Sequence, residues 1–368
     1  MSERESGPSR ESALRALGAV RGDLARPDPA EPDAVRCLAC AHRCLLRPGR
    51  AGICKVRFHA GGGTLLVPWG YTAGGLSPDP IEKKPFFHVR PGSVALSFGM
   101  LGCDMHCSFC QNWYTSQALR DPYAGVPVSP VQPEEIVDVA RQTGAAAVVS
   151  TYNEPLITAE WAAAVFDLCR AAGLLTGFVS NGNATPEVLD FLRPRLDLFK
   201  VDLKCFDDRA YRRLGAVLAN VCASIEGAVA RGLWVEVVTL LVPGFNDDPA
   251  QLARLAGFLG SVSPDIPWHV TAFRPTYRLQ DRGATTPEDL ARAVAIGRDA
   301  GLRFVYAGNV PGLADESTRC PGCSTLLIER RGFSVRRVAL SDDGRCPRCG
   351  RAVPGVWPRG RVAVAPAA

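Results

Sequence analysis

The stretch "FGMLGCDMHCSFCQNWYTSQ", residues 98–117, carries three cysteines at the spacing C-x3-C-x2-C. They are Cys103, Cys107 and Cys110. Cysteine thiolates are soft ligands that select iron–sulfur clusters, zinc or Cu(I). A cubane cluster has four irons, so three thiolates would leave one iron open to a further ligand. The alternative is a zinc site that His106, or a distant cysteine or histidine, completes.

A β-strand is expected at the start of this stretch, because residues 93–100 form a short run of mostly apolar residues. Similar runs recur along the chain, and amphipathic segments with a helical period lie between them. The expected strands cover residues 93–100, 145–153, 174–181, 196–204, 233–243, 267–273 and 303–310.

Proline marks the start of the helices expected between these strands. The prolines are Pro133, Pro186, Pro249 and Pro287. Thr185, Asp248 and Thr286 stand directly before three of them, where a side-chain oxygen can accept an unpaired backbone N–H. The alternation predicts an α/β fold with parallel strands and crossover helices, a partial (βα)6 TIM-like barrel. In such barrels the reacting groups lie at the carboxyl ends of the strands.

The barrel is expected to span residues 91–312, with further segments on both sides. Residues 1–35 are rich in Arg, Ala, Pro and acidic residues, which favours a flexible N-terminal extension. Residues 36–90 hold many cysteines, glycines and prolines, and we expect a Cys-rich metal-binding module there. Residues 313–358 carry the last cysteine group, expected as a zinc-ribbon module, and residues 359–368 are expected as a disordered tail.

Composition limits the classes of function. A net charge of +5 with a pI near 8.5 is too weak to indicate nucleic acid, so we expect no such partner. No run approaches the length of a membrane-spanning helix, and the N-terminus lacks the apolar stretch of a secretory signal. We therefore expect a cytoplasmic protein without a membrane partner. Most of the 14 cysteines are clustered, which in a reducing compartment indicates metal sites rather than disulfides.

The last cysteine group consists of two C-x2-C pairs: Cys320, Cys323, Cys346 and Cys349. Two such pairs on either side of a strand-rich insert are typical of a zinc ribbon. Zinc then replaces a hydrophobic core, which about 40 residues cannot build alone. The insert contains four arginines, which we interpret as a solvated face, with docking to nucleic acid as the alternative.

The first cysteine group has the spacing C-x2-C-x3-C-x9-C. Its members are Cys37, Cys40, Cys44 and Cys54. Structural zinc is the first interpretation. An auxiliary iron–sulfur cluster, which would carry electrons or bind substrate, is the alternative. His42 lies inside the loop and could replace one thiolate.

The three-cysteine loop resembles that of the radical S-adenosylmethionine (SAM) enzymes, whose pattern is C-x3-C-x-aromatic-C. Phe109 is the matching aromatic residue. The resemblance implies a [4Fe–4S] cluster whose open iron is chelated by SAM. It also implies the reaction: one electron cleaves SAM to methionine and a 5′-deoxyadenosyl radical, which abstracts hydrogen from a substrate.

The family places its SAM contacts at successive strand ends, and several motifs here match. "TYNEP" resembles its Gly-Gly-Glu-like motif, although Tyr152 and Asn153 replace the glycines, and "VDLK" is similar to the activating-enzyme branch. By this resemblance the SAM contacts are Phe109, Asn153, Glu154, Ser180, Asn181, Asp202, Lys204 and Val242. The candidates for substrate contact or catalysis are His269, Arg274, Tyr152 and Cys205.

The segments "DPIEKKPFFHVRPG", "CQNWYTSQ", "TYNEPLITAEW" and "FVYAGNVPG" narrow the resemblance. Together they look like the AmmeMemoRadiSam system radical SAM enzymes, relatives of the pyruvate formate-lyase activating enzymes, over about residues 36–358. Members of that group tend to occur with Memo-like and AMMECR-type partner proteins. The resemblance does not supply the substrate, so a partner protein as substrate is a hypothesis, and a one-electron donor such as flavodoxin or ferredoxin is expected. The alternatives are modification of a small molecule or RNA, and a non-catalytic multi-zinc interaction protein. The last would leave "TYNEP" and "VDLK" unexplained.

Overall fold

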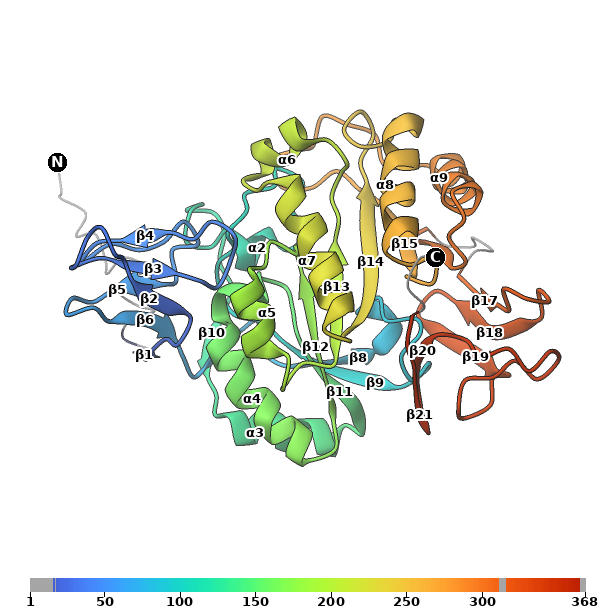
Figure 1. Cartoon of the computed structure of the whole chain (residues 1–368), viewed down its shortest axis with the longest axis horizontal. Helices are drawn as coiled ribbons and strands as arrows, with labels where there is room; N and C mark the ends of the chain where they lie inside the picture. The colour runs from blue at the N-terminus through green and yellow to red at the C-terminus, as the bar shows by residue number, and fades with distance from the viewer. Residues whose placement is uncertain (1–15, 17, 311–315, 365–368) are drawn as a thin grey trace.

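The computed structural model describes residues 16, 18–310 and 316–364, and its centre is a sheet of eight strands (Figure 1). The strand order is β16-β15-β14-β13-β12-β11-β9-β8, and every neighbouring pair from β9 to β16 is parallel. The parallel strands are β9 (Val94–Phe98), β11 (Ala145–Ser150), β12 (Leu175–Ser180), β13 (Leu198–Asp202), β14 (Trp234–Leu241), β15 (Trp268–Ala272) and β16 (Val305–Gly308). All seven strands expected from the sequence are confirmed.

Helices follow the strands in alternation and lie on the side of the sheet that faces the viewer in Figure 1. They are α3 (Pro133–Gln142), α4 (Ala159–Ala171), α5 (Pro186–Leu192), α6 (Asp208–Leu214), α7 (Leu218–Ala230), α8 (Pro249–Val262) and α9 (Pro287–Asp299). The expected proline starts are confirmed. So are the caps: Thr185, Asp248 and Thr286 each accept a backbone N–H of the first helical turn.

The edge of the sheet next to β9 is formed by β8 (Ser77–Pro80), which runs antiparallel to it. Among the described residues β8 and β16 pair on one side only, so the sheet stays open. The structure confirms an α/β fold with a mostly parallel sheet. Nearby, β7 (Tyr71–Ala73) pairs with β10 (Val128–Pro130), so residues 71–80 belong to the central domain rather than to a module that ends at residue 90.

Residues 18–35 were expected to be part of a flexible extension, and for these residues the expectation is wrong. β1 (Ala19–Arg21) pairs with β6 (Leu65–Pro68), and β2 (Ala25–Pro27) pairs with β3 (Val35–Cys37). The two small sheets are completed by β5 (Phe58–His59) and β4 (Leu45–Leu46). Leu24 between β1 and β2 is buried, so this segment is held by a hydrophobic contact as well as by strand pairing. Residues 1–15 and 17 lie outside the described residues.

The C-terminal part contains the antiparallel strands β17 (Thr318–Arg319), β18 (Leu326–Arg331) and β19 (Ser334–Val338). A further pair, β20 (Gly355–Trp357) and β21 (Gly360–Val362), follows. β21 lies in the segment expected as a disordered tail, which is wrong for residues 360–362, because Trp357 is buried and anchors the pair. Residues 365–368 are not among the described residues.

One hydrophobic core joins the N-terminal strands to the sheet and its helices, since Leu24, Val35 and Leu46 belong to the same buried cluster as Phe98 and Trp268. Among the described residues no single helix is long and apolar enough to span a membrane. Only α6 and α7 taken together reach that length and hydropathy, and they are bent by 92°.

Candidate active site

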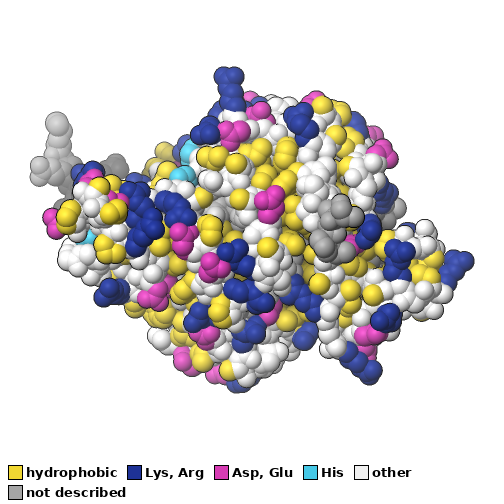
Figure 2. Space-filling view, viewed as in Figure 1, with side chains coloured by type: hydrophobic (Ala, Val, Ile, Leu, Met, Phe, Trp, Pro, Cys, Tyr) yellow, Lys and Arg dark blue, Asp and Glu magenta, His cyan; other side chains and the backbone are white. Residues whose placement is uncertain are grey.

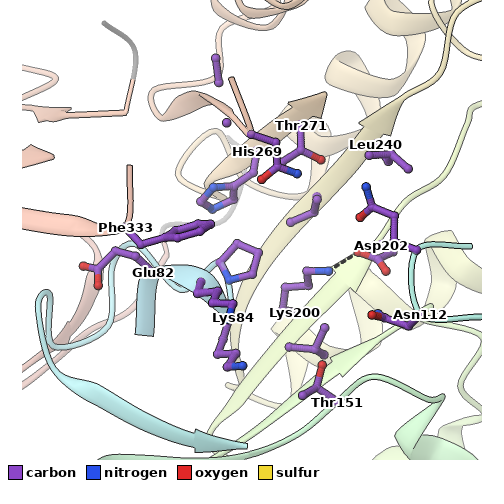
Figure 3. Close-up of a pocket in the computed structure, with 18 of the residues that line it drawn as sticks. Glu82, Lys84, Asn112, Thr151, Lys200, Asp202, Leu240, His269, Thr271 and Phe333 are labelled. Carbon is purple, nitrogen blue, oxygen red and sulfur yellow. Dashed lines mark hydrogen bonds and ion pairs between the residues drawn. The ribbon is translucent and has the colours of Figure 1, made fainter. Parts of the chain in front are cut away.

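A cavity of about 770 Å³ lies at the carboxyl ends of the parallel strands. Its walls come from the cysteine loop, from the ends of β13, β14 and β15, from residues 82–85 and from the hairpin of β18 and β19. Figure 3 shows His269 and Phe333 facing the cavity from one side and Asp202 and Asn112 from the other. This is the edge of the sheet where the sequence predicted the chemistry.

The cysteine loop joins β9 to the short helix α2 (Trp113–Ser116) and presents Cys107 and Cys110 to the cavity. The third sulfur, on Cys103, accepts the backbone N–H of Met105 at 3.4 Å. Burial raises the pKa of the Cys107 thiol to about 12, and the ammonium of Lys204 opposes that rise. A buried thiol of this kind stays protonated near neutral pH and becomes a thiolate when a metal ion binds the sulfur and the proton is released to solvent.

Two glycines allow the loop to fold tightly. A Cβ on Gly99 would lie 2.8 Å from the carbonyl oxygen of Thr151, and one on Gly102 would lie 3.0 Å from that of Cys54. Gly102 also has a φ of +95°, which side chains disfavour. The loop is therefore fixed between β11 on one side and the N-terminal cysteine group on the other.

Three charged side chains from β13 and the residues after it form one cluster. Asp202 pairs with Lys200 and, at 3.5 Å, with the Nζ of Lys204, and all three line the cavity. Burial lowers the pKa of Lys200, whereas at Lys204 the opposite effect of Asp202 prevails and the pKa rises. The sequence predicted Asp202 and Lys204 but missed Lys200. The signal was present, because residues two apart on a strand face the same side.

Glu154, Ser180 and Asn181 are brought together as expected, but behind the cavity wall and not on it. Glu154 accepts the hydroxyl of Ser180 and the backbone N–H of Asn181, both at 2.7 Å, and the N–H of Leu156 at 3.0 Å. Burial, helped by the charge of Asp104, raises the pKa of Glu154 to about 8. This carboxyl group ties the end of β11 to the end of β12.

Asp104, inside the cysteine loop, is a buried carboxylate that the sequence analysis missed. It accepts the side-chain N–H groups of Asn181 at 2.7 Å and of Asn183 at 2.8 Å. The Nδ2 of Asn181 also lies 3.8 Å from the Cys103 sulfur. These contacts attach the cysteine loop to the residues that follow β12, so Asn181 positions the loop.

Tyr152 and Asn153 take different directions. Tyr152 lines the cavity with a φ of +73°, and its hydroxyl lies 3.0 Å from the Nζ of Lys84, which also lines the cavity. Asn153 turns away and accepts the N–H of Met100 at 2.9 Å. Tyr152 thus adopts a left-handed backbone conformation that a glycine would adopt without strain.

His269 faces the cavity from β15, and its Nε2 lies 2.7 Å from the Oε2 of Glu236. Glu236 is fully buried and also accepts the backbone N–H groups of Phe87 and His88. Burial lowers the pKa of His269 although Glu236 opposes this, so the imidazole is neutral at pH 7. Arg274 is exposed and lines the cavity.

Val242 and Cys205 are further predicted site residues that do not line the cavity, whereas Phe109 does. The backbone N–H of the buried Val242 donates to the Asn246 side chain, and the apolar side chains that β14 presents to the cavity are Val238 and Leu240. The thiol of Cys205 is buried and points to the carbonyl oxygen of Asp207 at 3.6 Å. The structure thus places Cys205 in the core, away from the cavity.

The C-terminal cysteines form a compact site. The ligand atoms of Cys320, Cys323, Cys346 and Cys349 all lie within 4.8 Å of one another. The sulfur pairs Cys320–Cys349 and Cys323–Cys346 are 3.5 and 3.6 Å apart. Four sulfurs around one zinc ion with bonds of about 2.3 Å would lie about 3.8 Å apart, so this group has the size of a single-ion site.

The N-terminal cysteines form a mostly buried group. Cys37, Cys40 and Cys54 are each at most 5% exposed, and Cys44 is partly exposed. Burial raises the pKa of Cys54 to about 12, and backbone N–H groups of Val56 and Arg57 lower it.

Residues 99–256, which include the cysteine loop and the Asp202 cluster, match the sequence profile described as the Radical SAM superfamily. This part of the chain is a radical SAM domain. An uncharacterized protein of Methanocaldococcus jannaschii is 34% identical over 321 residues, which cover 87% of this chain and 95% of that protein. The pyruvate formate-lyase-activating enzyme of Listeria monocytogenes is a more distant relative, 26% identical over 54% of this chain and 82% of its own.

Among solved structures, a radical SAM methyltransferase from Sphaerobacter thermophilus aligns with a TM-score of 0.47 and 19% identity, over 60% of this chain and 68% of that one. A domain of the pyruvate-formate lyase-activating enzyme from Bacteroides vulgatus aligns with a TM-score of 0.39 and 20% identity, over 44% of this chain and 99% of that one.

Proposed function

We propose that this radical SAM protein is an enzyme that holds a [4Fe–4S] cluster on Cys103, Cys107 and Cys110 and binds SAM in the adjoining cavity. One observation carries the proposal: Cys107, Cys110 and the charged cluster around Asp202, which are far apart in the sequence, line the same cavity. A zinc scaffold would have no use for a three-thiol loop that opens onto such a cavity.

The donor set fits this assignment. Three soft thiolates suit iron–sulfur ligation and leave one iron for another ligand. When bound there, the cluster and SAM supply one-electron cleavage of the cofactor and a 5′-deoxyadenosyl radical that takes hydrogen from the substrate.

The residues of the chain then have separate tasks. Asp202 and Lys204 bind the charged groups of SAM, as expected from "VDLK", and Lys200 keeps Asp202 ionised because it lowers the pKa of that carboxyl. Glu154 positions Asn181 and the strand ends rather than lining the cavity. Phe109, which packs on Phe245 with 5.2 Å between ring centroids, forms an apolar wall that excludes water.

We further propose a small organic substrate with an anionic group. The cavity volume of about 770 Å³ lies within the range of about 300–1,000 Å³ that is usual for small-molecule sites. Phe333 and Glu316 from the C-terminal part line it, so one side is covered by this chain itself. Arg274 lines it without an ion-pair partner in the described part of the chain and suits a carboxylate or phosphate.

A partner protein as substrate is the second candidate. It is favoured by the relationship to pyruvate formate-lyase-activating enzymes, whose name denotes a protein target. In that case a loop of the partner must pass Phe333, which is 44% exposed. Memo-like and AMMECR-type partners, a flavodoxin or ferredoxin donor, a cytoplasmic location and zinc in the C-terminal group remain part of this proposal.

The test is to prepare the protein anaerobically, reduce it with dithionite and measure 5′-deoxyadenosine and methionine formed from SAM. We expect both products from the wild type, and a loss of at least about 100-fold when Cys103, Cys107 and Cys110 are all changed to serine. Cys169→Ser is the control, because Cys169 is buried in α4 and lies outside the cavity. A wild type with at least about four irons per chain that neither cleaves SAM nor changes its EPR signal with SAM would overturn the proposal.

A further inference from the structure

The two four-cysteine groups of this chain differ in size. Within the described residues, the C-terminal group is the only set of three or more His, Cys, Asp or Glu side chains whose ligand atoms all lie within 4.8 Å of one another. The N-terminal cysteines, all of them described, are therefore spaced more widely than the ligands of a single tetrahedral ion. The sulfurs of Cys103, Cys107 and Cys110 do not all lie within 4.8 Å of one another either.

The spacing of sulfurs distinguishes the two kinds of metal site. One zinc ion draws its four sulfurs to about 3.8 Å from one another. In a cubane cluster each thiolate binds a different iron, so the sulfurs stand further apart. By this comparison Cys37, Cys40, Cys44 and Cys54 belong with the cluster-binding triplet and not with the C-terminal group.

The N-terminal group also lies directly against the three-cysteine loop. The carbonyl oxygen of Cys54 faces Gly102, and the backbone N–H of Ala41 donates to Asn183 at 2.8 Å. Arg120 joins both segments, since its guanidinium donates to the carbonyl oxygens of Met105 and Ile53.

We propose that Cys37, Cys40, Cys44 and Cys54 bind a second iron–sulfur cluster, through which electrons reach the active site. Four thiolates leave no iron open, so this cluster carries electrons and does not bind substrate. The donor loses one electron and the second cluster gains it. That cluster is oxidised again when it passes the electron on, and no atom is transferred. The electron-carrying role rests on the proposed function, whereas the presence of the cluster does not.

The surface over this group fits an acidic donor protein such as a flavodoxin. Of the six Lys and Arg residues in residues 36–57, four form ion pairs with carboxylates of other segments, whereas Arg50 and Lys55 form none within the described residues. Figure 2 shows Lys and Arg side chains gathered over the N-terminal strands. Arg50 and Lys55 are exposed, and Ile53 between them is 38% exposed. Complementary charge of this kind raises the rate of association and makes it depend on salt.

The experiment compares iron, sulfide and zinc contents and EPR spectra of three anaerobically reconstituted full-length proteins. They are the wild type, a triple variant with Cys103, Cys107 and Cys110 changed to serine, and a double variant, Cys40→Ser/Cys44→Ser. We expect about eight irons per chain in the wild type and about four in each variant, with about one zinc throughout. SAM should alter the EPR signal of the double variant but not that of the triple variant.

A triple variant that holds two zinc ions and no iron would overturn the inference, and it would leave the proposed function intact if SAM still alters the wild-type signal. The opposite result would count against the proposed function instead. In that case the triple variant holds an iron–sulfur cluster, but the EPR signal of the double variant does not change with SAM. Retained zinc shows that a variant has folded. For the electron path, we expect reduced flavodoxin to transfer an electron to the SAM-binding cluster at least about tenfold more slowly in the double variant than in the wild type. Dithionite should still reduce that cluster in both proteins. Equal rates with flavodoxin would overturn the electron-carrying role.

Discussion

Arg57 and Glu160 form a two-pronged ion pair between the N-terminal strands and α4. The Nη1–Oε2 distance is 2.6 Å and the Nη2–Oε1 distance is 2.7 Å, with side chains 1% and 4% exposed. Glu160 also accepts the backbone N–H of Leu24 at 3.2 Å. The pair holds the segment that carries Cys54 against the central domain, so it bears on the geometry of both metal groups.

We expect Arg57→Met to destabilise the protein by about 3–5 kcal/mol, because it leaves the Glu160 carboxylate buried without its partner. The measurement is the free energy of unfolding in urea, at fixed metal content and under anaerobic conditions. The double variant Arg57→Met/Glu160→Met should recover most of that loss, since no charge is then buried alone.

The matched control is Arg47→Met. Arg47 pairs with Glu31 at 2.8 Å, but its side chain is 65% exposed, so we expect a change of at most about 1 kcal/mol. Equal effects at residues 57 and 47 would show that the buried pair does not hold the N-terminal strands in place.

The parallel strands β11 to β15 could be predicted because each is a mostly apolar run and a helix follows it. Thr185 and Asp248 show the same local logic: a cap, then proline, then an amphipathic face. The N-terminal strands could not be predicted in this way. β1 and β2 have three residues each, and their partners lie far along the chain or across a turn, so no periodicity marks them.

Site residues could be predicted where they stand at the end of a strand and point into the cavity. They were mispredicted or missed where the side chain points into the protein instead. Asp202 and Lys204 follow their strand and reach the cavity. Glu154 also follows its strand, but hydrogen bonds with Ser180 and Asn181 turn it inward, and a strand-end pattern does not show that direction. Asp104 was missed because an acidic residue between two cysteines has no periodic signature.

The Asp202 cluster gives a prediction for cofactor affinity. We expect Lys204→Met to weaken SAM binding by about 10- to 100-fold, because it removes a charge-assisted contact worth about 1.5–3 kcal/mol. Folding should survive, since Asp202 keeps Lys200 as a partner. The measurement is equilibrium binding of SAM to the reconstituted, unreduced protein.

Arg212→Met is the control for Lys204. Arg212 lies on α6, the helix after the same strand, and pairs with Asp208 with a side chain 64% exposed. Its loss should leave the SAM dissociation constant within about twofold of the wild type. If both variants bind SAM as the wild type does, Lys204 is not a cofactor contact.

The C-terminal cysteines give a prediction for metal content. Cys323→Ser should remove about one zinc per chain and loosen residues 320–349, because the four cysteines join the turn after β17 to residues 346–349. Cys222→Ser, a half-buried cysteine on α7 outside every metal group, should keep the zinc. Zinc analysis together with amide hydrogen exchange checks this, and an unchanged zinc content in Cys323→Ser would contradict it.

His88 gives a prediction for pH dependence, because it is buried where residues 81–90 meet the C-terminal part. Its Nδ1 lies 2.7 Å from the carbonyl oxygen of Pro354, and its Nε2 lies 2.6 Å from the hydroxyl of Tyr306. Burial lowers the pKa of His88 from 6.5 to about 4. Between these two values the unfolded chain binds the proton and the folded chain does not, so protonation favours unfolding.

The stability that His88 contributes is therefore complete above pH 6.5 and is lost as the pH falls towards 4. Between pH 7.5 and 5 we expect this group to account for about 2 kcal/mol of lost unfolding free energy. In His88→Gln the side chain cannot titrate. The difference between the unfolding free energies at pH 7.5 and pH 5, measured in urea, should therefore be about 2 kcal/mol smaller in this variant than in the wild type. Carboxylates with a lowered pKa, such as Glu160, lose their contribution to the free energy of unfolding only below about pH 4.5. They therefore do not affect the comparison between pH 7.5 and pH 5. Parallel pH profiles for the two proteins would show that the pKa of His88 is the same in the folded and unfolded states.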